Sequence, residues 1–154
     1  MIQRESYMQQ IWPFINGELV KVLTGIRRSG KSVMLELIQQ ELLASGISPE
    51  QFIILNFEKM ENSVLCTAET LHNEILKRAS AIHGKTYLFF DEIQEVADWE
   101  KCVNSLRATL DCDIYLTGSN AKLLSGELAT YLGGRYVEFV IYRSEEHTSE
   151  LQSR

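Results

Sequence analysis

The 154-residue sequence has few cysteines, no excess of positive charge and no long apolar run. Its three cysteines are odd in number and form no C-x-x-C pair, which argues against a disulfide framework and favours buried free thiols in a reducing cytosol. A formal net charge of −6 argues against a broadly basic surface for nucleic acid. No apolar run approaches the length of a membrane span, and the first residues lack the apolar centre of a signal peptide. We therefore expect a cytoplasmic chain that does not associate with membranes.

The composition is that of a soluble globular protein. Apolar residues make up 45% of the chain and charged residues 23%, which are ordinary proportions. At this length, the chain supports one domain with a real hydrophobic core. The three histidines show no metal-ligand spacing.

The segment at residues 25–32 organises the sequence. It reads Gly-Ile-Arg-Arg-Ser-Gly-Lys-Ser and fits G-x-x-x-x-G-K-[ST], the phosphate-binding loop of P-loop NTPases. An apolar strand pattern precedes it and apolar residues at helical spacing follow it, which is the setting that the motif requires. The glycines let the backbone wrap a phosphate and aim its N–H groups at the anion. The predicted nucleotide-binding residues are Gly25, Ile26, Arg27, Arg28, Ser29, Gly30, Lys31, Ser32 and Val33.

Within this loop, three side-chain types suggest distinct roles. Lys31 supplies a mobile positive charge for the β and γ phosphates, and the Ser32 hydroxyl is placed to ligate Mg²⁺. Arg27 and Arg28 face phosphates, solvent or a partner, and the sequence does not choose among these. The predicted cofactors are ATP and Mg²⁺. The alternative is a glycine-rich turn that binds nothing.

Two acidic residues follow the apolar segment at residues 86–90. Asp91, at the tip of this predicted strand, is placed to hold Mg²⁺ opposite Ser32. Glu92 is placed to polarise the water that attacks the γ-phosphate. This is the Walker B arrangement, and its alternative is a solvated acidic turn.

Strand and helix patterns alternate along the chain. Predicted strands lie at residues 19–24, 52–57, 86–90, 113–117 and 136–141, with helical patterns between most of them. Residues 59–66 read as a polar connection with little pattern, and Thr67 and Asp98 read as helix N-caps. The alternation predicts an α/β domain with a mainly parallel sheet.

Ser119 and Asn120 come directly after the fourth predicted strand. If that strand lies between the phosphate-loop strand and the Walker B strand, either residue would reach the γ-phosphate or the attacking water and act as a sensor. A helix cap is the equally weighted alternative.

Together these motifs resemble AAA+ ATPases, specifically a prokaryotic AAA-domain family of ATP-binding proteins. The matching segments are residues 25–32, 88–94, 116–120 and 134–136. The resemblance implies an αβα sandwich whose five-stranded sheet has the order 5-1-4-3-2, with a sensor at Ser119 or Asn120. It also implies that Arg135 is the counterpart of an arginine finger that completes a neighbouring subunit's site, and hence a homo-oligomer. A surface or intramolecular ion pair is the alternative for Arg135.

The end of the sequence differs in character. Residues 143–153 match the translated start of a widely used sequencing adapter, so we expect residues 1–142 to form the nucleotide-binding core and residues 143–154 to be a non-native tail. A natural polar tail is the alternative. Members of the resembled family continue into a helical lid and a C-terminal domain. The resemblance therefore implies a core without its lid, and a DNA or protein partner that would bind through the absent C-terminal region.

These observations favour Mg²⁺-dependent ATP hydrolysis, with Lys31, Glu92, Asn120 and Arg135 as the catalytic residues. The alternatives are a nucleotide-dependent binding switch with little turnover, a small-molecule phosphotransferase, and a gene fragment without activity of its own. Glu92 argues against the phosphotransferase, because a kinase must keep water unreactive.

Overall fold

The computed structural model describes residues 2–26, 29–119, 123 and 132–142. The helices are α1 (Ile2–Ile11), α2 (Lys31–Ala44), α3 (Ala68–Ala79) and α4 (Trp99–Thr109), and the short 3-10 helices are η1 (Trp12–Phe14), η2 (Pro49–Gln51), η3 (Met60–Leu65) and η4 (Ile93–Glu95). The strands are β1 (Val20–Thr24), β2 (Phe52–Asn56), β3 (Thr86–Asp91), β4 (Cys112–Gly118) and β5 (Tyr136–Val140). No helix in this part of the chain is both long and apolar enough to cross a bilayer.

The five strands form one sheet in the order β2-β3-β4-β1-β5, and all four neighbouring pairs are parallel. This confirms the predicted order, which is the same order read from the other edge. Because the strands are parallel, their carboxyl ends share one edge of the sheet. Asn56 pairs with Asp91 there, and Thr24 pairs with Gly118. The segments that follow β1, β3 and β4 therefore converge.

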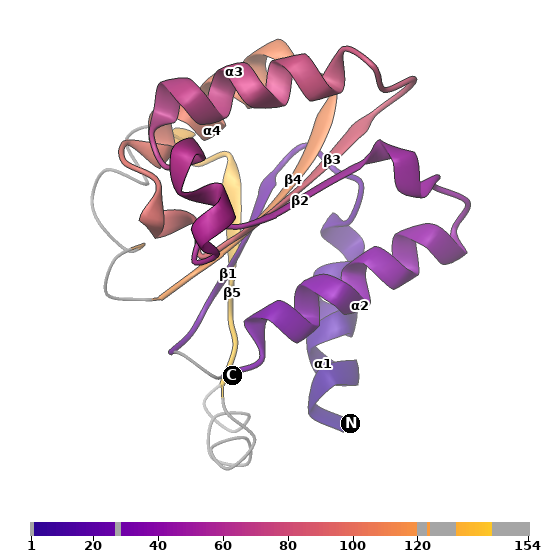
Figure 1. Ribbon diagram of the computed structural model, residues 1–154. Helices are drawn as coiled ribbons and strands as arrows, with labels where there is room; N and C mark the ends of the chain where they lie inside the picture. The colour runs from indigo at the N-terminus through magenta and orange to yellow at the C-terminus, as the bar shows by residue number, and fades with distance from the viewer. Residues whose placement is uncertain (1, 27–28, 120–122, 124–131, 143–154) are drawn as a thin grey trace.

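Helices cover both faces of the sheet, as predicted for an αβα sandwich. Figure 1 shows α3 and α4 on one face and α1 and α2 on the other. Leu71 and Ile75 of α3 and Val103 and Leu106 of α4 are fully buried, and their spacing places them on one side of each helix. Burial of each such side chain stabilises the folded state by about 1.5–3 kcal/mol relative to leaving it exposed. Met34, Ile38 and Leu42 of α2 bury the opposite face in the same way.

Two local predictions need correction. Thr67 caps α3 as predicted, since its hydroxyl accepts from the Thr70 N–H at 3.2 Å. Asp98 does precede α4, but its side chain makes no capping hydrogen bond and its backbone is left-handed, with φ of 57°. The segment predicted to lack pattern contains η3, which turns the chain between β2 and α3. Both differences depend on backbone geometry that apolar periodicity does not report.

A buried ion pair lies at the amino edge of the sheet. Lys21 of β1 pairs with Asp113 of β4, and neither side chain is exposed to solvent. The Lys21 ammonium also donates to the Gly17 carbonyl at 3.1 Å, while the Tyr115 hydroxyl donates to Asp113 Oδ2 at 2.6 Å. The Asn16 N–H donates to the same carboxylate oxygen at 2.8 Å. Burial lowers the pKa of Lys21, and the Asp113 charge opposes that shift. The network ties the turn before β1 to β4.

The predicted burial of the cysteines holds fully only for Cys102, because Cys66 and Cys112 are partly exposed. Desolvation raises the pKa of the Cys102 thiol to about 12. We expect Cys102 in the folded chain to react with iodoacetamide at pH 8 at least about tenfold more slowly than Cys66, because alkylation requires an accessible thiolate. Mass spectrometry of timed alkylation measures both rates. Urea should make the rates equal, and equal rates without urea would contradict the burial of Cys102.

Candidate nucleotide site

The loop between β1 and α2 has a backbone that demands glycine at two positions. Gly30 precedes the helix with φ of 100°, in the left-handed region. Gly25 has φ of 153°, and a Cβ on it would lie 2.4 Å from the Ile141 carbonyl oxygen and 2.8 Å from Ser29 Oγ. These two glycines shape the loop at the carboxyl edge of the sheet, directly before the start of α2.

Lys31 is the first residue of α2 and is only 4% exposed. Its ammonium donates to the Gly25 carbonyl at 2.6 Å and to the Ile26 carbonyl at 3.3 Å. Glu92 Oε2 lies 3.8 Å from the same nitrogen. The cation is thus held across the loop by oxygen atoms, which is the kind of ligand that a phosphate also presents.

Ser32 and Asp91 come together although 59 positions separate them in the sequence. Ser32 Oγ donates to Asp91 Oδ2 at 2.6 Å, and Asp91 is the last residue of β3. Beside this pair lies a cavity of about 230 Å³, whose lining includes Asn56 and Lys59. Hydroxyl and carboxylate oxygens are ligands that Mg²⁺ prefers. The predicted metal-ligand pair is therefore brought together.

Glu92 has an unusual backbone and a restrained side chain. Its φ of 59° and ψ of 53° are left-handed, which costs a non-glycine residue about 1–3 kcal/mol. Its N–H donates to Thr117 Oγ1 at 2.9 Å, and its carboxylate accepts from Gln94 Nε2 at 2.7 Å. A Cβ on Gly118 would lie 2.5 Å from Gln94 Oε1, so the residue after Thr117 has no room for a side chain. These neighbours fix where the Glu92 carboxylate lies.

Thr117 and Gln94 are not among the predicted site residues. Thr117 is fully buried near the end of β4, and its hydroxyl donates to Asp91 Oδ1. The signals in the sequence are a hydroxyl residue at the end of an apolar strand and its place in the matching segment 116–120. Gln94 belongs to the Asp-Glu-Ile-Gln run that the predicted motif includes, but its contact with Glu92 depends on the turn that η4 makes.

The chain's own residues fit a nucleotide with Mg²⁺. Within the part of the chain that the structure describes, Ser29 Oγ is a buried polar atom without a hydrogen-bond partner, and it lies inside the loop. The two loop glycines, the Lys31 cation and the Ser32–Asp91 pair all lie at the carboxyl edge of the sheet, around the loop between β1 and α2. We find no group of three or more His, Cys, Asp or Glu residues suited to a metal ion among the described residues, so an ion here would rely on Ser32, Asp91 and phosphate oxygens.

The other predicted residues lie further away or outside the described residues. Ser119 follows β4 at the same edge as the loop, whereas Arg27, Arg28, Asn120 and residues 143–154 are outside the described part of the chain. Arg135 is exposed, and its carbonyl accepts from the Val20 N–H at 3.0 Å, at the amino edge of the sheet. A five-residue strand separates that edge from the phosphate loop, a distance of roughly 16 Å. Arg135 therefore lies away from its own chain's site.

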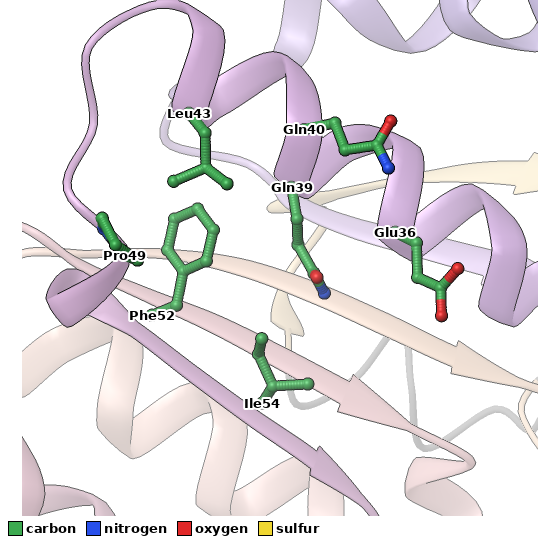
Figure 2. A pocket seen from close by; sticks show the side chains of 7 residues that line it. All are labelled: Glu36, Gln39, Gln40, Leu43, Pro49, Phe52 and Ile54. Carbon is green, nitrogen blue, oxygen red and sulfur yellow. The ribbon is translucent and has the colours of Figure 1, made fainter.

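A larger hollow lies between α2 and β2, with a volume of about 500 Å³. Figure 2 shows Phe52 and Ile54 of β2 facing Leu43 and Gln39 of α2 across it. Its lining is mostly apolar and uncharged apart from Glu36. It shares Glu36, Gln39 and Ile54 with the smaller cavity beside Asp91 but contains none of the predicted site residues.

The sequence matches the AAA domain family over residues 17–145. The chain belongs to this family. This AAA domain is 46% identical over 142 residues to an uncharacterized protein of Haemophilus influenzae, and the match covers 92% of the chain and 36% of that protein. An uncharacterized protein of Methanocaldococcus jannaschii is 41% identical over 117 residues, covering 75% of the chain and 24% of the relative. The chain thus spans about a third and a quarter of these two relatives.

Solved structures share the fold of this AAA domain. AMPPCP-bound DnaA from Aquifex aeolicus superimposes with a TM-score of 0.59 at 15% identity, covering 99% of this chain and 51% of that one. A chain from the Drosophila ORC complex with AT-rich DNA and Cdc6 gives a TM-score of 0.57 at 10% identity, covering 94% and 58%. At these identities the likeness shows an AAA+-like α/β fold. Membership of the AAA domain family implies a P-loop ATPase module.

Proposed function

We propose that this AAA domain binds ATP with Mg²⁺ and hydrolyses it. The observation that carries the proposal is the convergence, at one edge of the sheet, of the Lys31 loop, the Ser32–Asp91 pair and the restrained Glu92 carboxylate. Each belongs to a different step: anchoring phosphate, holding the metal ion and activating water. The AMPPCP-bound state of DnaA, which shares the fold, is consistent with an ATP-like ligand.

Lys31 and Glu92 have different roles in the proposed reaction. Lys31 leaves the Gly25 and Ile26 carbonyls for the β and γ phosphate oxygens, which offer it full negative charges. Glu92 then loses its ion pair with Lys31 and keeps the Gln94 hydrogen bond, so its carboxylate stays oriented to accept the proton of the attacking water. Mg²⁺, when bound, neutralises phosphate charge in the transition state.

Arg135 and further partners belong to the same proposal. Because Arg135 is exposed and lies at the amino edge, it would act as a finger only on a second copy of the chain, so this role requires a homo-oligomer. The DNA of the ORC complex belongs to that assembly. A net charge of −6 argues against a broadly basic surface on this AAA domain, so we assign DNA or protein partners to the parts of the relatives that this chain does not cover.

Substitution of Lys31 with alanine tests the nucleotide site. We expect ATP·Mg²⁺ affinity to fall by about ten- to a hundredfold, because a charge-assisted contact worth about 1.5–3 kcal/mol is lost. Isothermal titration calorimetry measures the affinity, and circular dichroism checks that the variant is folded. Lys77→Ala, which removes an exposed lysine from α3, is the matched control. Equal affinities of wild type and Lys31→Ala would refute the site, while tight binding without turnover would favour the nucleotide-dependent switch.

A further inference from the structure

Thr117 makes two hydrogen bonds that join the two acidic residues of the site. Its hydroxyl has a single proton. The Glu92 N–H can only donate, so at 2.9 Å it must give its proton to Thr117 Oγ1. The Thr117 proton is therefore directed to Asp91 Oδ1, which can only accept when ionised. The direction of both bonds follows from chemistry alone.

The consequence for Asp91 is a fixed carboxylate. One oxygen is held by Thr117, and the other, Oδ2, faces Ser32 at 2.6 Å. Asp91 is nearly buried and Thr117 is fully buried, so water does not compete for the first contact. Without the Thr117 hydroxyl, the carboxylate could rotate and present either oxygen, or neither, to Ser32.

The consequence for Glu92 concerns its backbone. A left-handed non-glycine residue persists only where its surroundings hold it. The Thr117 hydroxyl supplies the acceptor for the Glu92 N–H in that conformation, directly before the turn that η4 begins. One hydroxyl thus sets the orientation of Asp91 and the direction in which the Glu92 side chain leaves the strand.

We propose that Thr117 is a positioning residue that orients Asp91 toward Mg²⁺ and holds the backbone of Glu92. The inference rests on the proposed function, since it concerns the same metal and the same water. Replacing a residue that hydrogen-bonds to a metal-binding side chain typically lowers metal affinity or activity by about 10–100-fold. A purely structural role, in which the hydroxyl satisfies the Glu92 N–H but does not orient Asp91, would change stability without affecting the dependence of nucleotide binding on Mg²⁺.

The test compares Thr117→Val, which keeps the shape and loses the hydroxyl, with Thr117→Ser, which keeps the hydroxyl. Affinity for a fluorescent, non-hydrolysable ATP analogue is measured in Mg²⁺ and in EDTA. The gain from Mg²⁺ is the ratio of the affinity for the analogue in Mg²⁺ to the affinity in EDTA. We expect Thr117→Val to reduce this gain by about tenfold, while its affinity in EDTA changes less than about twofold. Thr117→Ser should retain the gain. If Thr117→Val does not fold, the pair Thr117→Ser and Thr117→Ala isolates the same hydroxyl.

The outcomes separate the inference from the proposed function. A wild-type chain that does not bind the analogue, or that binds it equally in Mg²⁺ and EDTA, overturns both. A wild type with a Mg²⁺-dependent gain that Thr117→Val or Thr117→Ala keeps overturns the inference alone. Loss of the gain in Thr117→Ser as well would show that the methyl group's packing matters instead, and would also overturn it.

Discussion

Replacement of Glu92 with glutamine is expected to lower ATP turnover by about two to four orders of magnitude, the usual contribution of a general base. The amide has nearly the same shape and can still contact Gln94, but it cannot take up a proton from water. ATP affinity should change little, because Glu92 is not one of the predicted phosphate-binding residues. Phosphate release in the steady state measures turnover, and calorimetry measures affinity.

Glu95 provides the matched control for this substitution. It lies three residues further along, as the last residue of the short helix η4 that begins directly after Glu92, and its side chain is exposed. Glu95→Gln makes the same change of charge near the site and should leave turnover within about twofold, as surface substitutions usually do. Undiminished turnover in Glu92→Gln would remove Glu92 from the role of base. A similar loss in both variants would point to the general negative charge of this turn.

The second large effect is expected far from the nucleotide. Substitution of Lys21 with methionine should reduce the free energy of unfolding by about 3–5 kcal/mol, because Asp113 is left charged and buried without its cation. The same change also removes a cation that lies 5.0 Å from the centre of the Tyr115 ring. Urea denaturation followed by circular dichroism measures the loss. Lys77→Met, at an exposed position of α3, should stay within about 0.5 kcal/mol of wild type.

A double substitution shows whether the charge is the cause. Adding Asp113→Asn to Lys21→Met removes the uncompensated charge, while the new amide oxygen still accepts from Tyr115 and Asn16. We expect the double variant to be more stable than Lys21→Met alone. A double variant that is less stable than Lys21→Met would mean that the uncompensated Asp113 charge is not the cause of the loss of stability. Since the network lies at the amino edge, the folded fraction of each variant should still bind ATP.

The sequence predicts the fold closely because its signals are local. Each of the five strands is predicted within one residue of its bounds at either end, since an apolar run and its flanking turn residues are contiguous. The phosphate loop is likewise a single segment, and Asp91 is recognisable because it follows an apolar strand. The order of the strands is not local, and it came from the resemblance to AAA+ proteins.

The remaining features could not be predicted because they are lateral contacts between strands. Thr117 meets Asp91 and Glu92 only because β4 lies beside β3. Lys21 meets Asp113 for the same reason, between β1 and β4. Once strand order is known, a lysine within an otherwise apolar buried strand indicates that a neighbouring strand must supply an acid. The left-handed backbones of Glu92 and Asp98 have no such signal, because neither residue type requires that conformation.

The outer edge of β2 has a practical consequence for handling the protein. No strand among the described residues pairs with this edge, and beside it Ile54 is 53% exposed and Leu43 41% exposed. Open strand edges with exposed apolar side chains favour strand addition and self-association between copies. We therefore expect solubility at high concentration to depend on this side of the sheet. A lysine in place of Ile54 would place charge at the open edge without replacing a predicted nucleotide-binding or metal-binding residue, and it would also change the lining of the cavity beside Asp91.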